Sequence, residues 1–334
     1  MSVGGRLPGR ELLNKLRAYW LVRATGRGPR PRPDDRWEEL VARVYRRSPF
    51  AALFRLERLG LDLTQAVWRW EGAPRGLLSG VRAAALPEGS LILLHLGMGL
   101  AFAKQVMGEL DPAAGEAVIG QALATFLALC GANARPGYLL ASYESLGAYV
   151  RLFQPRRTAA AGRLLAGLDA AAAECFWHGA GRGIYFLPRH LPPGSTARAL
   201  ALCRREPPDA TARADALGGF FVAATMVNLR HPAVLERVLA AAGEHTDEEE
   251  AIAGGIAACA LARRETTPED PALPALLAHR PQPRHAALWR QRVQEPVSRA
   301  LDEYYPLLRR AGRLPELARH RDLAALARVC ADHP

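Results

Sequence analysis

Few polar residues occupy positions suited to acid–base chemistry, because most of the predicted helices are apolar. His95 lies in the middle of the longest apolar run, GSLILLHLGMGLAFAKQVM at 89–107. An imidazole titrates near neutral pH, so His95 is either a general acid or base or a hydrogen-bonded core residue. Glu144, flanked by tyrosines in the run LLASYESLGAYV, is the candidate general acid. His178, directly before the glycine-rich GAGRG, is the third candidate catalytic residue.

Three charged residues are candidates for holding a substrate. Arg182 lies in GAGRG, where a guanidinium and exposed amide groups would form an anion site; the alternative is a buried arginine that braces loop carbonyls. Lys104 is the only lysine besides Lys15. If Lys104 is buried, its pKa falls and it can act as a base or bind a carbonyl, whereas at a helix end it would favour the C-terminal dipole. Asp62, soon after Gly60, is either a helix cap or a substrate contact.

Motifs for cofactors and metal ions are missing from the sequence. The five cysteines stand alone without CxxC spacing, which is typical of free thiols in a reducing cytosol and argues against a zinc site. Neither GxxxxGK[ST], HExxH nor GxSxG occurs. Metal–pyrophosphate chemistry at Asp34-Asp35 or at Asn228 and Glu236 is disfavoured, because the first pair precedes the core and the second has Pro232 where Ser or Thr is needed. We therefore expect neither a cofactor nor a metal.

The composition predicts an all-α protein built from helical hairpins. Alanine and leucine dominate, β-branched residues are sparse, and almost no stretch alternates apolar and polar residues with period two. A Gly-Gly pair at 218–219 recurs at 254–255, 36 residues later, each time inside an apolar helix. This spacing favours stacked hairpins, as in a solenoid, around one elongated core.

Basic charge is concentrated near the N-terminus. Residues 1–50 carry twelve Lys or Arg against five acids, in a chain whose net charge is +11. GRGPRPRPD at 26–34 predicts a basic arm and linker over 1–35 that is dispensable for folding, followed by a single multi-helical domain over 36–334. The charge reflects either coding bias on solvated faces or an anionic partner such as an acidic carrier protein. Basic residues without regularly interleaved aromatics argue against nucleic acid.

No apolar segment predicts insertion into a membrane. The N-terminus lacks the apolar region of a signal peptide, and the run at 91–103 is too short to span a bilayer. Together with the unpaired cysteines, this predicts a cytoplasmic protein without a membrane span. The sequence makes no prediction of the oligomeric state.

One short stretch resembles a known family. FWHGAGRGIYF at 176–186 is similar to the F-D-Q-G-x-G-R-x-x-W-F signature of a bacterial domain-of-unknown-function family that is encoded near enediyne and other polyketide gene clusters. Tyr185 stands where the signature has tryptophan. The resemblance covers about 50–265, because further similar segments follow the family's order at 93–103, 215–225 and 253–263.

The resemblance implies a setting, bacterial secondary metabolism, and no particular reaction. The family's D-G-Y-G-F-H stretch reads GQALATF at 120–126, so the chain would be a divergent member. His95 and Arg182 both belong to resembling stretches, and both are polar groups beside glycines in apolar surroundings. Buried polar groups need partners, and one shared cavity supplies them at lower cost than two. We therefore predict one site for this pair, although 87 residues separate them.

Two functions are compatible with these features. The first is a cofactor-independent tailoring enzyme, of a cyclase or isomerase type, that acts on a hydrophobic polyketide, polyene or terpenoid intermediate. Its proton transfers would use His95, Glu144 and His178, with Arg182, Lys104, Asp62 and Tyr185 contacting the substrate. The second is a non-catalytic helical scaffold or binding protein of a natural-product pathway. A well-formed pocket lined by these polar groups favours the enzyme, whereas a flat or filled interior favours the scaffold.

Overall fold

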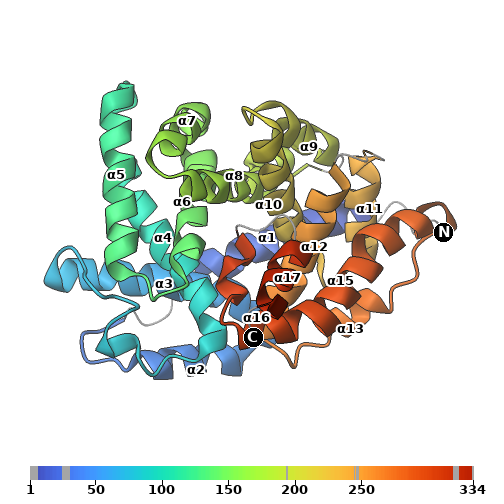
Figure 1. Ribbon diagram of the computed structural model, residues 1–334, viewed down its shortest axis with the longest axis horizontal. Helices are drawn as coiled ribbons and strands as arrows, with labels where there is room; N and C mark the ends of the chain where they lie inside the picture. Colours follow the sequence, from blue (N-terminus) through green and yellow to red (C-terminus); the bar gives the residue numbers. More distant parts are fainter. Residues whose placement is uncertain are drawn as a thin grey trace. The chain divides into compact units, whose positions relative to one another are not determined.

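The computed structural model describes residues 7–24, 31–192, 195–243, 245, 248–318 and 323–332. These residues form helices and connecting turns without any strand, so the predicted all-α class is confirmed (Figure 1). Most of the linker at 26–34 lies outside the described residues. The chain divides into two units, which we describe separately: unit 1 comprises Met1–Tyr19 and Gly181–Pro334, and unit 2 comprises Trp20–Ala180.

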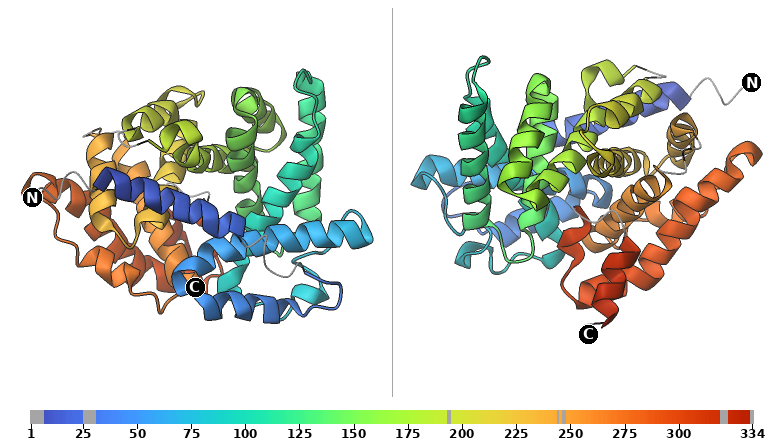
Figure 2. Two further views of the ribbon diagram at one scale, coloured as in Figure 1. Left: turned by 180° about the vertical axis from the view of Figure 1, so that it is seen from behind. Right: turned by 45° about the horizontal axis from the view of Figure 1, so that its top comes forward.

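Unit 2 is organised around α4. Its helices are α2 (Trp37–Arg47), α3 (Pro49–Glu71), α4 (Leu91–Gly108), α5 (Glu116–Asn133), α6 (Leu139–Phe153), α7 (Thr158–Leu168) and the first part of α8 (Ala170–Phe186). Helix α4 packs against α3, α5 and α6, and α5 stands at the edge of this group in both Figure 1 and Figure 2. The apolar run that dominates the sequence is therefore the core helix of its unit.

Helix α3 is one unbroken helix. Ser48 begins it as an N-cap, since its hydroxyl accepts a hydrogen bond from the Ala51 amide, and Pro49 occupies the first turn. Gly60 lies inside the helix and does not interrupt it. The missing side chain at Gly60 makes room for the backbone of Leu94 on α4. Asp62 therefore lies inside α3, and the helix-cap alternative expected from the sequence is wrong. Its carboxylate accepts from Arg58 Nε at 2.9 Å, one helical turn earlier.

Two glycines of α4 explain how tightly it is held. A Cβ at Gly97 would overlap the carbonyl oxygen of Glu57 on α3, and one at Gly99 would overlap that of Ser142 on α6. Both neighbouring helices thus approach the α4 backbone directly, closer than any side chain permits. Ser145 adds a polar link from α6, since its buried hydroxyl donates to the Leu96 carbonyl at 2.6 Å.

Unit 1 contains the remaining helices. They are α1 (Leu7–Ala24, up to Tyr19), the end of α8, α9 (Thr196–Arg205), α10 (Ala210–Asn228), α11 (Pro232–Ala242), α12 (Glu249–Thr266), α13 (Ala272–Leu277), α14 (Ala286–Trp289), α15 (Glu295–Arg299), α16 (Tyr305–Arg310) and α17 (Leu323–Asp332). One apolar cluster joins α12 to the C-terminal helices through Leu261, Leu308 and Leu326.

The two Gly-Gly pairs of the sequence meet each other in this unit. A Cβ at Gly255 on α12 would overlap the Gly218 carbonyl on α10, so the small residues allow these two helices to approach closely. The pairs thus form one helix–helix contact, which does not by itself establish a repeat. A solenoid-like arrangement is therefore not confirmed.

The C-terminal region is more continuous than the prolines of the sequence suggest. The chain stays helical from Ala286 to Arg310, although Pro296 and Pro306 lie within this range. Two π-helical segments, Arg290–Gln294 and Ala300–Tyr304, each end two residues before a proline. A proline has no amide hydrogen and removes one α-helical bond. The wider π turns accommodate that gap without ending the helix.

Helix α1 is docked on unit 1 through buried polar groups. Asn14 donates to Asn228 at 2.9 Å, and the Lys15 ammonium donates to the His190 carbonyl at 3.0 Å. Lys15 also pairs with Glu11 at 3.0 Å. The left view of Figure 2 shows α1, in dark blue. Because leaving these buried partners unsatisfied is costly, we now expect α1 to stabilise unit 1, in contrast to the dispensable arm expected from the sequence.

In the part of the chain that the structure describes, two helical stretches are long and apolar enough to cross a membrane by length and composition. They are Glu88–Gly108, which is 67% buried, and Glu116–Asn133, which is 33% buried. The first is the core helix α4, extending further than the run at 91–103 on which the sequence argument relied. Core helices pass the same criteria, so neither stretch is a clear membrane span.

Candidate functional site

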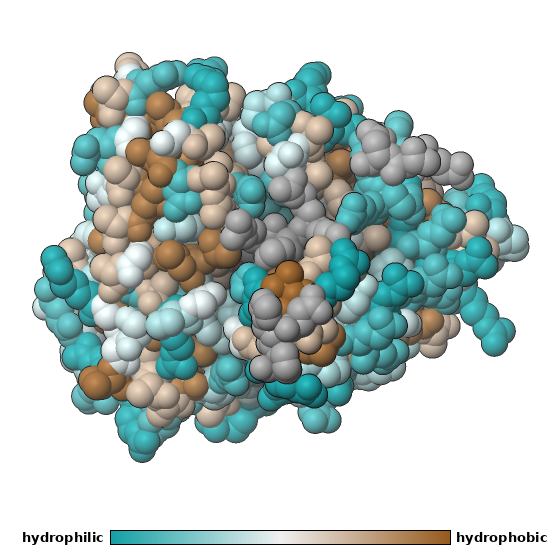
Figure 3. All heavy atoms as spheres, viewed as in Figure 1, coloured by the Kyte–Doolittle hydropathy of each residue, from teal (hydrophilic) through white to brown (hydrophobic). Residues whose placement is uncertain are grey.

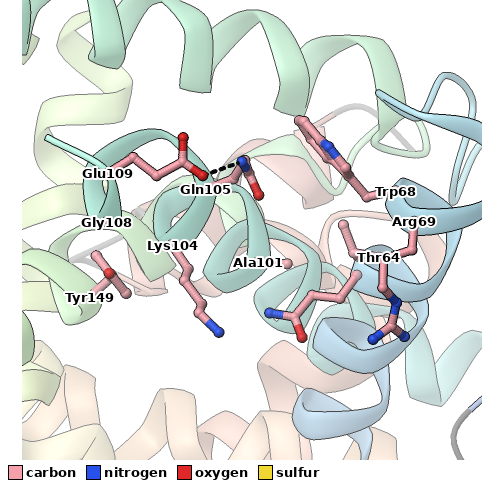
Figure 4. Close-up of a pocket in the computed structure, with 10 residues that line it drawn as sticks. Thr64, Trp68, Arg69, Ala101, Lys104, Gln105, Gly108, Glu109 and Tyr149 are labelled. Carbon is pink, nitrogen blue, oxygen red and sulfur yellow. Dashed lines mark hydrogen bonds between the residues drawn. The ribbon is translucent and has the colours of Figure 1, made fainter.

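A pocket of about 400 Å³ opens between α3, α4 and α6 of unit 2 and contains Lys104, one of the expected substrate-binding residues (Figure 4). Lys104 and Arg69, from α4 and α3, extend toward the same side of it. Tyr149 enters from α6. The other lining residues are Thr64, Gln65, Trp68, Ala101, Gln105, Gly108 and Glu109. Its size lies within the range of small-molecule sites in proteins.

Helical spacing places these side chains together. Ala101, Lys104 and Gly108 follow each other at intervals of three and four residues, so they share one face of α4. Thr64 and Trp68 share a face of α3 in the same way. The Trp68 ring is fixed by an edge-on contact with the core residue Phe102, whose centroid lies 6.1 Å away. The pocket wall is therefore built on rigid helices.

Tyr149 and Gly108 form the α6 end of the pocket. A Cβ at Gly108 would lie 2.9 Å from the Tyr149 hydroxyl, so only glycine leaves the phenol its present room. Burial raises the pKa of the Tyr149 phenol, which therefore stays protonated and able to donate a hydrogen bond at neutral pH. Within α4 and its C-cap, the Gln105 side chain donates a hydrogen bond to the Glu109 carboxylate at 2.9 Å, one helical turn later.

His95 lies outside this pocket, and both of its ring nitrogens have partners within the fold. The Arg135 amide donates to Nε2 at 3.0 Å, so Nδ1 carries the proton and donates to the Leu91 carbonyl at 2.7 Å. The ring stacks on Tyr138, with the centroids 4.9 Å apart. Burial lowers the pKa of His95 to about 4, so the imidazole is neutral at pH 7. These contacts connect α4 to the turn before α6; proton transfer by His95 stays a prediction.

The structure brings together the other two candidate catalytic residues, Glu144 and His178. Their Oε1 and Nδ1 atoms lie 3.3 Å apart. The helices α6 and α8 meet closely here, because a Cβ at Gly179 would overlap the Glu144 carbonyl. Glu144 is only 2% exposed, whereas 13% of the His178 side chain is exposed. The pair forms a carboxylate–imidazole dyad, and neither residue lines the Lys104 pocket.

Arg182 and Tyr185 belong to unit 1. Arg182 is buried in α8, where Gly181 packs against the Ala216 carbonyl of α10. Tyr185 is fully buried, and its hydroxyl accepts from Asn228 at 2.7 Å. Because His95 lies in unit 2 and Arg182 in unit 1, their predicted shared site stays a prediction.

Sequence reasoning missed Lys15 as the partner of Tyr185. The Lys15 ammonium lies 4.1 Å from the centre of the Tyr185 ring. Burial lowers the pKa of Lys15 and raises that of Tyr185. The missed signal was a lysine at helical spacing from Glu11 in a chain that contains only one other lysine. This network explains the burial of Tyr185 by contacts within the fold, without any substrate.

No group of three or more His, Cys, Asp or Glu side chains in the described part of the chain has a geometry that could hold a metal ion. All five cysteines are buried, and none forms a disulfide bond. Asp62, engaged by Arg58, does not line the Lys104 pocket, and Lys104 is the one expected substrate-binding residue found there.

Comparisons with known proteins found no match to a family model, a curated protein or a solved structure. The resemblance to the enediyne-associated family therefore rests on the sequence stretches alone.

Proposed function

We propose that unit 2 binds a small molecule carrying an anionic or carbonyl group in the pocket between α3, α4 and α6. The observation that carries this proposal is that Lys104 and Arg69 line one opening and extend toward the same side of it, with the Tyr149 phenol also in the lining. The lining contains two cations and one acid, Glu109, which already accepts from Gln105. An ammonium, a guanidinium and a phenol all donate hydrogen bonds, which suits a carboxylate, a phosphate or a polarised carbonyl.

In the setting that the resemblance indicates, the ligand would be an intermediate of bacterial secondary metabolism. The proposal places the protein with the helical binding proteins of such a pathway. Binding is better supported than catalysis at this pocket, because His95, Glu144 and His178 lie outside it.

Binding of short ions of opposite charge tests this function. Hexanoate and hexylammonium differ in head group and share their chain, so saturation-transfer NMR with each reports on the charge preference. We expect hexanoate to bind more tightly, and K104Q to weaken it about three- to tenfold, as loss of a charge-assisted hydrogen bond does. R156Q, which removes an exposed arginine of the same unit elsewhere, is the matched control. Equal binding of the two ions, or no effect of K104Q, would refute the function.

A second candidate function, acid–base catalysis, is favoured by the Glu144–His178 dyad. A buried carboxylate next to an imidazole that reaches the surface can pass a proton to or from a bound substrate. Replacing His178 by Asn in the source organism, followed by mass spectrometry of extracts, tests it. Accumulation of an intermediate with a definite mass difference would support an enzyme. Unchanged products would exclude a chemical role for the dyad.

A further inference from the structure

A groove with a mostly apolar lining adjoins the Lys104 pocket on the side of α5. It has a volume of about 750 Å³, and Glu109 is its only ionisable lining residue. The remaining lining residues are Trp68, Ala73, Gln105, Val106, Leu110, Ala117, Val118, Gln121, Ala122, Thr125 and Leu129. The groove thus lacks the cations of the pocket that contains Lys104 and Arg69.

The two sites are continuous. Trp68, Gln105 and Glu109 line both the pocket and the groove. In Figure 4 these three side chains lie on the side of α4 away from the Lys104 ammonium. A ligand that extends past Trp68 would therefore leave a cationic compartment and enter an apolar one.

Helix α5 gives the groove its open apolar wall. Only a third of this apolar helix is buried, and Val118 keeps 51% of its surface exposed. Figure 3 shows apolar side chains gathered over the region where Figure 1 places α5. Contiguous apolar surface of this kind usually marks a binding site.

We propose that the natural ligand is an amphipathic anion, a carboxylate or phosphate on a long hydrocarbon chain. The head group would bind Lys104 and Arg69, and the chain would pass Trp68 and lie along α5. The inference rests on the proposed function, because that function supplies the head-group site. A single ligand molecule is favoured over a protein or a bilayer, since the cations occupy one end only and both volumes match small-molecule sites.

A chain-length series tests this inference with carboxylates as probes. Affinities of hexanoate, decanoate and tetradecanoate are measured by isothermal titration calorimetry below their micelle concentrations. A fully buried methylene improves affinity about fourfold. Because the groove is open on one side, we expect roughly twofold per added methylene, or about tenfold or more from hexanoate to decanoate.

The variant V118D places a charge in the groove without threatening the fold. Position 118 is exposed and lies in the first turn of α5, where an aspartate favours the helix dipole. We expect V118D to abolish most of the gain with chain length and to leave hexanoate binding unchanged. V81D, at a position that is 93% exposed and away from the groove, is the matched control and should behave like the parent protein.

The outcomes distinguish a failure of this inference from a failure of the proposed function on which it rests. Hexanoate binding that depends on Lys104 without a gain in affinity with chain length would overturn the inference and leave the proposed function standing. A gain with chain length that K104Q does not affect would overturn both, because the head-group site would be absent. Retention on vesicles of phosphatidylglycerol that V118D abolishes, with no affinity for monomeric tetradecanoate, would assign the groove to a membrane surface and also overturn the inference.

Discussion

Helices α4 and α5 are nearly matched in sequence terms and opposite in their surroundings. Both have 18 residues, both are dominated by apolar side chains, and both contain internal glycines. Yet the α4 stretch is 67% buried and α5 only 33%. Gly97 and Gly99 of α4 receive neighbouring backbones, whereas a Cβ added at Gly120 or Gly131 of α5 would meet no neighbouring atom within 4 Å. Apolar content alone thus does not decide burial. Helix α4 is buried where its glycines receive neighbouring backbones, whereas α5 lacks such glycine contacts and borders the groove.

The largest expected effect is on the glycine contacts that hold α4. In G99A the new methyl group would collide with the Ser142 carbonyl, which is backbone and cannot rotate away. Because α4 and α6 must then separate, we expect the free energy of unfolding to fall by about 3 kcal/mol or more, at the upper end of overpacking costs. Urea unfolding followed by circular dichroism measures it. A loss below about 1 kcal/mol would show that the two helices are not in direct backbone contact.

A second test uses the pH dependence that His95 imposes on the core. Its pKa is about 4 in the folded protein and 6.5 in the unfolded chain, so the unfolded state binds the extra proton between these values. Stability contributed by the neutral ring is therefore complete above pH 6.5 and lost as the pH falls toward 4, by about 3 kcal/mol in total.

The measurement compares the parent protein with H95N by urea unfolding at pH 7 and pH 5. Carboxylates titrate in both proteins, so the difference between their losses of stability isolates the imidazole. We expect the parent to lose more stability than H95N on acidification. Equal losses of stability in the two proteins would contradict the burial of the ring on α4. They would mean that the ring is solvated, like a side chain on the open face of α5.

Part of this comparison could be predicted from the sequence. Helical periodicity predicted the helices, whereas the two Gly-Gly pairs, which suggested a repeat, contact each other at Gly218 and Gly255. Polar residues in apolar runs singled out Glu144 and His178 as separate candidates, and their proximity was not predicted; it emerges only from the packing of α6 against α8. Helical continuity was harder, because Gly60 and Pro296 are tolerated when a neighbouring backbone or a π turn compensates for them.

The candidate pocket was less predictable than the fold. Lys104 was found because lysine is rare in this chain, but Arg69, Gln105 and Tyr149 carry no signal that separates them from ordinary surface or core residues. Their convergence depends on how α3, α4 and α6 pack, which is a tertiary property. The docking of α1 was missed for the same reason: Asn14 and Lys15 find partners more than 170 residues away.

A smaller effect is expected from the polar link between α6 and α4. S145A removes a buried hydroxyl that donates to the Leu96 carbonyl, and we expect a loss of about 1 kcal/mol in the free energy of unfolding. T125A is the counterpart on α5, where the hydroxyl bonds only to Gln121 of its own helix and is exposed. That substitution should change stability by less than about 0.5 kcal/mol. Equal effects in urea unfolding would contradict the difference in burial between the two helices.

The smallest expected effect has the opposite sign and lies on α5. Gly120 is inside this helix, and an added methyl group would meet no atom within 4 Å. Alanine restricts the unfolded chain more than glycine does and fits the helix without strain, so G120A should stabilise the protein by about 0.5–1 kcal/mol. The same chemical change that disrupts α4 at Gly99 would thus improve α5, a reversal that thermal unfolding of both variants can detect. Destabilisation by G120A would mean that another surface packs against Gly120, so that α5 would be held there as α4 is held at Gly99.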